Sequence, residues 1–266
     1  MAIRIAVSGA TGRMGRALAS LVAAANDLTL VGGIARVARE PDAALALGFP
    51  RIESPAGAAP ILAEADVLID FSSPDQLARV LEEARPDGVP GALVIGTTGL
   101  DDDLLARLDE IAASRAVMAE ANFSVGIQVL TALATAAAAG LPASEYDVEI
   151  VETHHRAKAD APSGTALSLA RAVALARSVD LAAVRRDGRS GRTGARPDGE
   201  IGLHALRGGS VIGEHRVLFL GQRERIELAH AASDRAVFAE GALVAARWLA
   251  GRAPGRYTFR EALGLA

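Results

Sequence analysis

Near its start the chain reads Ile3-Arg-Ile-Ala-Val-Ser8-Gly9-Ala-Thr-Gly12-Arg-Met-Gly15, and this segment is the strongest indication of the fold class. The apolar residues up to Ser8 predict a short buried strand, and residues 16–25 predict a helix. A strand, a glycine turn and a helix in this order favour a dinucleotide-binding motif, here with the spacing G-x-x-G-x-x-G. Such a turn lets the backbone approach a pyrophosphate closely. An ordinary βα turn is the alternative, but it would not need three glycines at this spacing.

Strands alternate with helices up to about residue 122. Further strands are expected at 28–34, 65–70, 92–95 and 116–118, with helices at 75–84 and 101–114. Residues 41–60 are expected to form a variable connection. This alternation is typical of an α/β protein with a Rossmann-like, doubly wound parallel sheet.

The pattern changes after residue 122. An alanine-rich helix is expected at 125–140, a strand at 146–151, a helix at 166–177 and a long basic loop at 185–200. Three antiparallel strands should follow at 201–207, 211–221 and 225–232, with a hairpin turn at 208–210. A last helix at 234–251 returns to the first domain. We therefore predict a dinucleotide-binding domain of residues 1–122 and 234–266, with an inserted α+β domain, 123–233, for substrate binding and oligomerisation.

Composition excludes several classes of function. The 28 basic and 32 acidic residues give a net charge of −4, and aromatic residues make up 3% of the chain, so we expect no nucleic-acid or anionic-membrane partner. The chain has no cysteine, which excludes disulfides and thiolate catalysis. The longest apolar stretch, 129–141, is shorter than the roughly 18 residues of a membrane helix. We expect a cytoplasmic protein, and no metal site is predicted.

The most unusual stretch is Glu152-Thr-His154-His155-Arg-Ala-Lys158-Ala-Asp-Ala-Pro-Ser163-Gly164-Thr165. It gathers histidines, an arginine and a lysine just before a helix that begins at Ser-Gly-Thr. The N-terminus of a helix offers free N–H groups and the positive end of its dipole to an anion. Loop residues bonded to water and a simple helix cap are the alternatives. We favour a site for an acidic small molecule that must also receive a proton.

The end of the second strand bears on the choice of cofactor. Enzymes that use NAD carry an Asp or Glu for the ribose hydroxyls about 20 residues past the glycine motif. This chain has Ala35 and Arg36 there, and a guanidinium favours the 2′-phosphate of NADPH over NADH. The other strand ends supply candidates to flank a nicotinamide, at Gly96–Thr98 and Ala121–Phe123. Thr97 and Asn122 are equally suited to be ordinary helix caps.

Several motifs together resemble the dihydrodipicolinate reductase (4-hydroxy-tetrahydrodipicolinate reductase) family, over nearly the whole chain. They are Gly9-Ala-Thr-Gly-Arg-Met-Gly15, Asp70-Phe-Ser, Gly96-Thr-Thr-Gly99, Asn122-Phe-Ser-Val-Gly126, His154-His-Arg-x-Lys-x-Asp-Ala-Pro-Ser-Gly-Thr165 and Val211-Ile-Gly-Glu-His215. The resemblance implies a homotetramer, here through the central sheet, in which NADPH or NADH reduces a planar cyclic dicarboxylate on the route to diaminopimelate and lysine.

The resemblance also implies roles for individual residues. His154 would be the general acid/base and Lys158 a proton donor, while His155, Ser163, Gly164 and Thr165 would hold the substrate. Cofactor contacts would fall on Gly9, Ala10, Thr11, Gly12, Arg13, Met14, Arg36, Gly96, Thr97, Thr98, Glu120, Ala121, Asn122 and Phe123. Glu120 is an unexpected charge beside a nicotinamide.

Two other functions are compatible with a dinucleotide domain. Another Rossmann reductase of an amino-acid pathway, such as a semialdehyde dehydrogenase, is one, but semialdehyde dehydrogenase chemistry needs a cysteine nucleophile, which this chain lacks. A non-catalytic NAD(P)-sensing regulator is the other, and it would have no use for the cluster of histidines and lysine. The chemistry of the cluster agrees with a reductase, because the reduction of a conjugated C=C–C=N system needs a hydride on carbon and a proton from a nearby acid.

Overall fold

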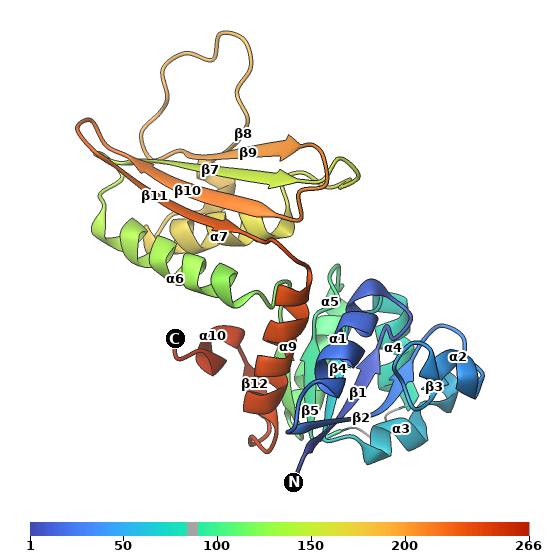
Figure 1. The fold of residues 1–266 in the computed structure, drawn as a ribbon. Helices are drawn as coiled ribbons and strands as arrows, with labels where there is room; N and C mark the ends of the chain where they lie inside the picture. The colour runs from blue at the N-terminus through green and yellow to red at the C-terminus, as the bar shows by residue number, and fades with distance from the viewer. Residues whose placement is uncertain (84–89, 266) are drawn as a thin grey trace. The chain divides into compact units, whose positions relative to one another are not determined.

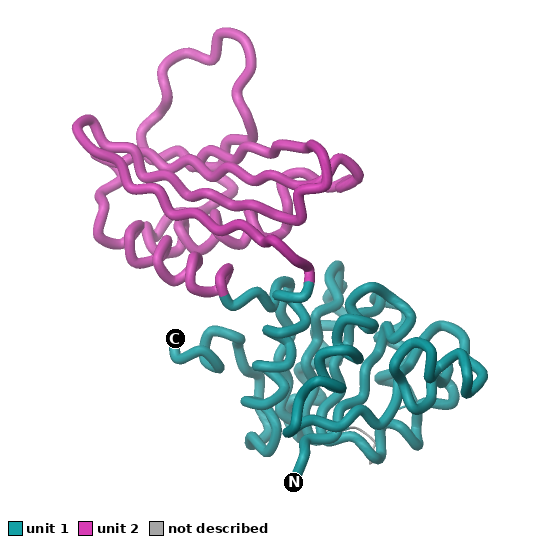
Figure 2. The backbone as a smooth tube through the Cα atoms, in the orientation of Figure 1, with its two compact units in different colours: residues 1–125, 236–266 teal, residues 126–235 magenta. Residues whose placement is uncertain are grey.

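The computed structural model describes residues 1–83 and 90–265. The chain forms two compact units, shown in different colours in Figure 2. Unit 1 consists of residues 1–125 and 236–266, and unit 2 of residues 126–235. Unit 2 is therefore an insertion between two parts of unit 1.

Unit 1 is built on a parallel sheet of seven strands in the order β12-β6-β5-β4-β1-β2-β3 (Figure 1). The strands are β1 (Ile3–Ser8), β2 (Leu28–Ile34), β3 (Ile52–Glu53), β4 (Val67–Asp70), β5 (Ala92–Ile95), β6 (Ala116–Ala119) and β12 (Gly255–Tyr257). The chain winds to one side of β1 through β2 and β3, and to the other side through β4, β5 and β6. The order therefore reverses between β1 and β4, where doubly wound sheets bind ligands.

Helices cover both faces of this sheet. Helices α1 (Arg13–Ala23) and α9 (Ala236–Leu249) share a core with one face, and α3 (Ala59–Glu64), α4 (Pro74–Glu83) and α5 (Asp102–Ala112) pack on the other. The shorter helices are α2 (Pro41–Leu45), the 3₁₀ turn η1 (Pro55–Gly57) and α10 (Phe259–Ala262). With both faces covered, the central strands are apolar on both sides, which explains runs such as Ala92-Leu-Val-Ile95.

Unit 2 is a five-stranded mixed sheet in the order β11-β10-β7-β9-β8. Its elements are α6 (Val125–Gly140, which begins at the end of unit 1), β7 (Asp147–His154), α7 (Gly164–Ala176), α8 (Leu181–Val184), β8 (Arg185–Asp187), β9 (Ile201–Arg207), β10 (Glu214–Leu220) and β11 (Arg225–Ala231). Helices α6 and α7 pack on one face through residues such as Leu130 and Leu169 (Figure 1). The opposite face of the sheet presents Leu206 and Leu218 together with charged side chains.

The predicted hairpin at 208–210 is wrong. Strand β9 pairs with β7 in parallel, and β10 pairs with the other edge of β7, so β7 lies between the two strands that the turn connects. Only β10 and β11 form the antiparallel hairpin expected of neighbours in sequence. The glycines at 208 and 209 allow the chain to leave β9 and cross the end of β7, where Gly208 N donates to His154 O at 3.0 Å.

Other boundaries also differ from the prediction. Helix α1 begins at Arg13, inside the glycine motif, because Gly12 already has the extended conformation of a cap residue. Residues 41–60 contain α2, β3 and η1 rather than a structureless connection. Strand β7 continues three residues past the predicted end at Val151, which places His154 on the strand and not in a loop. The predicted end of α4 at Ala84 lies outside the described residues.

Among residues 1–83 and 90–265, no helix combines the length and the apolar character needed to cross a bilayer.

Candidate active site

The glycine motif forms a tight turn at the carboxyl end of β1. Gly9 has φ = +85°, a region that favours glycine, and a Cβ atom there would overlap the backbone carbonyl of Phe71. A Cβ on Gly15 would lie 2.7 Å from Ala10 Cα, so this glycine allows α1 to pack against the turn. Since the cap of α1 is itself a glycine, no capping side chain occupies the N–H groups of its first turn. The turn has the geometry that a pyrophosphate needs.

The other predicted cofactor residues follow strands of the same parallel sheet. Arg36 follows β2 and is exposed, Gly96–Thr98 follow β5, and Glu120–Phe123 follow β6. Because parallel strands end at one edge, these segments lie along the same edge of the sheet as Gly9–Met14.

At this edge Asp70 organises the loops with its buried carboxyl. The Thr97 hydroxyl and the Ser72 hydroxyl both donate to Asp70, the latter at 2.9 Å to Oδ2, and Ser72 N donates to Thr97 Oγ1 at 2.8 Å. Burial raises the pKa of Asp70, and hydrogen bonds from Ser8, Thr97 and Ser72 oppose that shift. The side chain of Thr97 thus ties the loop after β5 to β4.

Two predicted cofactor residues have side chains engaged elsewhere in unit 1. Glu120 Oε1 accepts a 3.0 Å hydrogen bond from Phe259 N in the first turn of α10, and burial raises the pKa of Glu120. This gives the unexpected charge a structural role as a helix cap. The ring of Phe123 is 1% exposed and packs against Phe71 and Phe259, with centroids 6.0 and 5.2 Å away. Its ring therefore belongs to the core of unit 1.

In unit 2, Glu152 is the centre of a buried polar cluster at the end of β7. It is 1% exposed, and its carboxylate accepts from Arg207 Nη1 at 2.8 Å, Arg207 Nη2 at 2.7 Å and Ser163 N at 3.0 Å. His154 Nδ1 lies 2.5 Å from Glu152 Oε2. Burial alone would raise the pKa of Glu152, but the bonds from Arg207, His154 and Ser163 N lower it overall.

Two histidines belong to this cluster, His154 in contact with Glu152 and His215 beside His154. Burial lowers the pKa of His154, Glu152 opposes the shift, and the charges of Lys158 and Arg207 add to it. The ring of His215 lies 5.3 Å from that of His154, and its Nε2 is 3.3 Å from Ser163 Oγ. Burial lowers the pKa of His215 to about 4, so this imidazole is neutral at pH 7.

The loop after β7 brings the remaining predicted residues to the same end of the sheet. Lys158 Nζ donates to Asp160 Oδ1 at 2.8 Å, and Lys158 N donates to His155 O at 3.1 Å. Ser163 caps the thirteen-residue helix α7, where its Oγ accepts from Ala166 N at 3.2 Å. Gly164 and Thr165 form the first turn of α7, whose N–H groups suit an anion.

Sequence reasoning missed the partners that hold His154. Glu152 lies in the segment 152–165, but a strand that ends at Val151, as predicted, does not indicate any role for it. Arg207 is 55 positions from Glu152, so no local spacing connects them. His215 lies in the Val211–His215 motif, and that resemblance was the one available signal.

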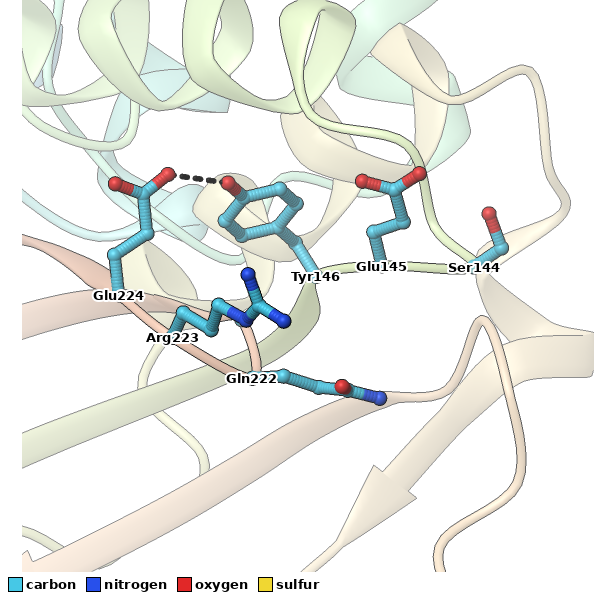
Figure 3. A pocket seen from close by; sticks show the side chains of 7 residues that line it. Ser144, Glu145, Tyr146, Gln222, Arg223 and Glu224 are labelled. Carbon is cyan, nitrogen blue, oxygen red and sulfur yellow. Dashed lines mark hydrogen bonds between the residues drawn. The ribbon is translucent and has the colours of Figure 1, made fainter.

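A separate pocket of about 530 Å³ lies at the opposite end of β7, between its start and the β10–β11 turn (Figure 3). Its wall includes Tyr146, whose hydroxyl donates to Glu224 at 2.5 Å, and the charged side chains of Glu145 and Arg223. Within the described part of the chain, no cluster of His, Asp and Glu is arranged to hold a metal ion. The polar cluster around Glu152 shares no residue with the lining of this pocket.

Comparison with known proteins gives one consistent family. The model described as "Dihydrodipicolinate reductase, N-terminus" matches residues 3–123, and "Dihydrodipicolinate reductase, C-terminus" matches residues 126–263. Proteins named 4-hydroxy-tetrahydrodipicolinate reductase from Caulobacter vibrioides and Thiobacillus denitrificans are 43% and 46% identical. They cover 98% and 100% of this chain, which in turn covers 97% and 100% of theirs.

A solved structure is similar over the same length. The dipicolinate-bound dihydrodipicolinate reductase from Paenisporosarcina sp. TG-14 superposes with a TM-score of 0.72 at 26% sequence identity, covering 98% of this chain and 99% of its own.

Proposed function

The chain belongs to the dihydrodipicolinate reductase family, and we propose that unit 1 holds its nicotinamide cofactor while unit 2 binds the substrate and supplies the proton. It is an NAD(P)H-dependent oxidoreductase that reduces the dihydrodipicolinate ring to tetrahydrodipicolinate in diaminopimelate and lysine biosynthesis. The observation that best supports the division of roles is the cluster of His154 and Lys158 beside the first turn of α7.

The reaction adds one hydride and one proton across a conjugated C=C–C=N system. When bound, the nicotinamide supplies the hydride. The residues of unit 2 then have two tasks, to hold two carboxylates and to deliver the proton. We assign one carboxylate to the N-terminus of α7 at Ser163, Gly164 and Thr165, and the other to His155 and Lys158. The proton comes from the pair His154 and Lys158.

The test is turnover in a coupled assay with freshly generated dihydrodipicolinate and NADPH or NADH. His154→Ala and Lys158→Ala should each lower kcat by about 10² or more if either side chain transfers the proton. Arg223→Gln, an exposed change at the far end of unit 2, is the control and should leave kcat unchanged. An unchanged kcat in both active-site variants would remove their assigned role. NADPH binding without consumption would favour a nucleotide sensor.

For the cofactor, we propose a preference for NADPH over NADH. It is supported by the exposed Arg36 at the end of β2 and by Ala35, where an acidic residue would otherwise bind the ribose. Arg36→Ala should raise the KM for NADPH about tenfold, since a charge-assisted hydrogen bond to phosphate is lost. The KM for NADH should change little, and equal losses for both cofactors would contradict the assignment.

We also propose that the chain is a homotetramer assembled through the five-stranded sheet. Helices α6 and α7 occupy one face, and the other exposes Leu206, with Val151 and Leu218 half-buried beside it. Apolar side chains on an open sheet face favour association with another copy. Leu206→Glu should dissociate the assembly in sedimentation velocity, and a monomeric unmodified protein would rule the proposal out.

A further inference from the structure

We propose that Glu152 and Arg207 act as one positioning pair, which turns Nδ1 of His154 inward and brings His154 to the reaction as a neutral imidazole. Lys158 is then the group that carries the proton. The inference deepens the proposed function, because it assumes that His154 and Lys158 belong to the reaction. It also makes claims about His154 that can be tested without turnover.

The hydrogen bonds of Glu152 fix the tautomer of His154. Arg207 donates to both carboxylate oxygens, at 2.8 and 2.7 Å, in the forked geometry of a strong ion pair. Those bonds and Ser163 N keep Glu152 ionised, and an ionised carboxylate can only accept hydrogen bonds. His154 Nδ1, 2.5 Å from Glu152 Oε2, must therefore carry the proton, and a neutral ring then has Nε2 as an acceptor.

Charge decides whether the ring takes a second proton. A lone buried carboxylate beside a histidine would stabilise an imidazolium, as the aspartate of a catalytic triad does. Here the guanidinium of Arg207 offsets the charge of Glu152 on the same two oxygens. The other groups facing His154 are the neutral His215 on β10 and, from the loop, the ammonium of Lys158 with its partner Asp160. Burial of the ring adds to the cost of a charge.

Gly213 keeps the outer side of the ring accessible. A Cβ atom on Gly213 would lie 3.1 Å from His154 Nε2, closer than most side chains come without displacement. The glycine therefore leaves the backbone beside Nε2 free of a methyl group. The His154 side chain retains 12% of its surface exposed, whereas that of Glu152 retains 1%. Glu152 and Arg207 thus hold Nδ1 of His154 and leave its Nε2 free to contact a ligand.

The direct test is NMR of the full-length protein labelled with ¹³C and ¹⁵N in histidine, with His154 assigned by its loss in His154→Gln. The ¹⁵N shifts at pH 7 should show a neutral ring protonated on Nδ1. Protonation on Nε2 alone, or on both nitrogens, would overturn the proposal. Arg207→Gln should raise the pKa of His154 by about one unit or more, because the offsetting charge is gone. Glu152→Gln should shift it in the opposite direction.

Two further variants separate charge from general disruption. Arg207→Lys retains the positive charge but loses the bidentate hydrogen bonds to Glu152. The pKa of His154 should therefore change less in Arg207→Lys than in Arg207→Gln. Arg223→Gln removes one exposed positive charge at the other end of the unit and should leave it unchanged. Shifts of the same sign in Arg207→Gln and Glu152→Gln would mean that the pair acts only through packing. If Arg207→Gln does not fold, the proposal is tested by the ¹⁵N shifts of His154 in the unmodified protein and by the pKa of His154 in the variants Arg207→Lys and Glu152→Gln.

Kinetics give a second readout, which also separates this inference from the proposed function. In Arg207→Gln the acidic limb of the pH profile of kcat/KM should move upward with the pKa of His154. If the NMR results hold but His154→Ala keeps full turnover, the positioning pair stands and the catalytic role of His154 fails. If His154→Ala loses turnover but the tautomer is wrong, the proposed function stands and the pair does not position the ring.

Discussion

Asp70 and Glu152 are both buried carboxyls at the end of a strand, one in each unit, with exposed fractions of 0% and 1%. Their surroundings differ in one respect. Asp70 receives bonds from hydroxyls and a backbone amide, and burial raises its pKa. Glu152 receives a guanidinium, an imidazole and an amide, and these bonds lower its pKa in spite of burial. Burial therefore raises the pKa of both carboxyls, but only in unit 2 do the bonded donors outweigh burial and lower the pKa overall.

The difference fits the ligand proposed for each unit. A nicotinamide cofactor brings its own phosphates to the edge of the unit 1 sheet, and a further negative charge there would repel them. Hydroxyl partners organise the loops after β4 and β5, and the raised pKa of Asp70 means that burial makes its negative charge less favourable there. In unit 2 the proposed ligand needs cations and an oriented imidazole, and an ionised Glu152 can hold both. Burial is common to the two sites, but the donors decide the charge.

Neutralising each carboxyl in turn should give the largest difference in the free energy of unfolding. Glu152→Gln leaves Arg207 without its ionised partner and should lower the free energy of unfolding by about 3 kcal/mol or more. Asp70→Asn keeps an acceptor for Thr97 and abandons no cation, so it should cost about 1 kcal/mol. Urea unfolding of both variants measures the difference. Equal costs would show that burial, rather than the donor set, governs the two sites.

The sequence revealed the framework of these sites but not their charge. The strand at 3–8, the strand at 28–34 and the helix at 125–140 could be predicted, because their apolar patterns are local. The predicted parallel sheet then placed Asp70 and Thr97 at the same edge. In unit 2 the pairing of β9 with β7 depends on residues far apart in sequence, and a glycine turn cannot show that another strand lies between those it connects. Without that pairing, Arg207 could not be placed beside Glu152.

The stability of the two variants should also depend on pH in opposite directions. Glu152 has a lowered pKa in the folded state, so its contribution to stability is present above its ordinary pKa of 4.5 and is lost as the pH falls through the lowered value. Asp70 has a raised pKa, so its charge penalises folding above that value and the penalty disappears as the pH falls toward 3.8. The cost of Glu152→Gln should shrink, and that of Asp70→Asn should grow, between about pH 6 and about pH 3.5. Urea midpoints over this range measure both trends, and parallel trends would contradict the assigned shifts.

Substitution of Glu149 should have the smallest effect on the free energy of unfolding. Its carboxylate contacts more cationic side chains than that of Glu152 but is less deeply buried. Arg189 donates to its oxygens at 2.9 and 3.0 Å, Arg196 at 2.9 Å, and His204 Nε2 lies 2.6 Å away, while 13% of the Glu149 side chain is exposed. These bonds lower the pKa of Glu149 to about 2 although burial would raise it. Its contribution should therefore be lost between pH 4.5 and about 2.

Glu149→Gln should cost only about 1 kcal/mol at neutral pH, because Arg189 keeps Glu200 and Arg196 keeps Asp147 as anionic partners when the Glu149 carboxylate is lost. Amide exchange in residues 188–200, which Arg189 and Arg196 tie to β7, should become faster. Glu227→Gln is the matched control on the same face of the sheet. Among the described residues its ion-pair partner is Arg216, at 3.6 Å, and the change should alter neither quantity measurably. If Glu149→Gln instead costs as much as Glu152→Gln, the number of cations around a carboxylate matters more than the other anionic partners of those cations. The contrast between Asp70 and Glu152 would then reflect the count of charged partners alone.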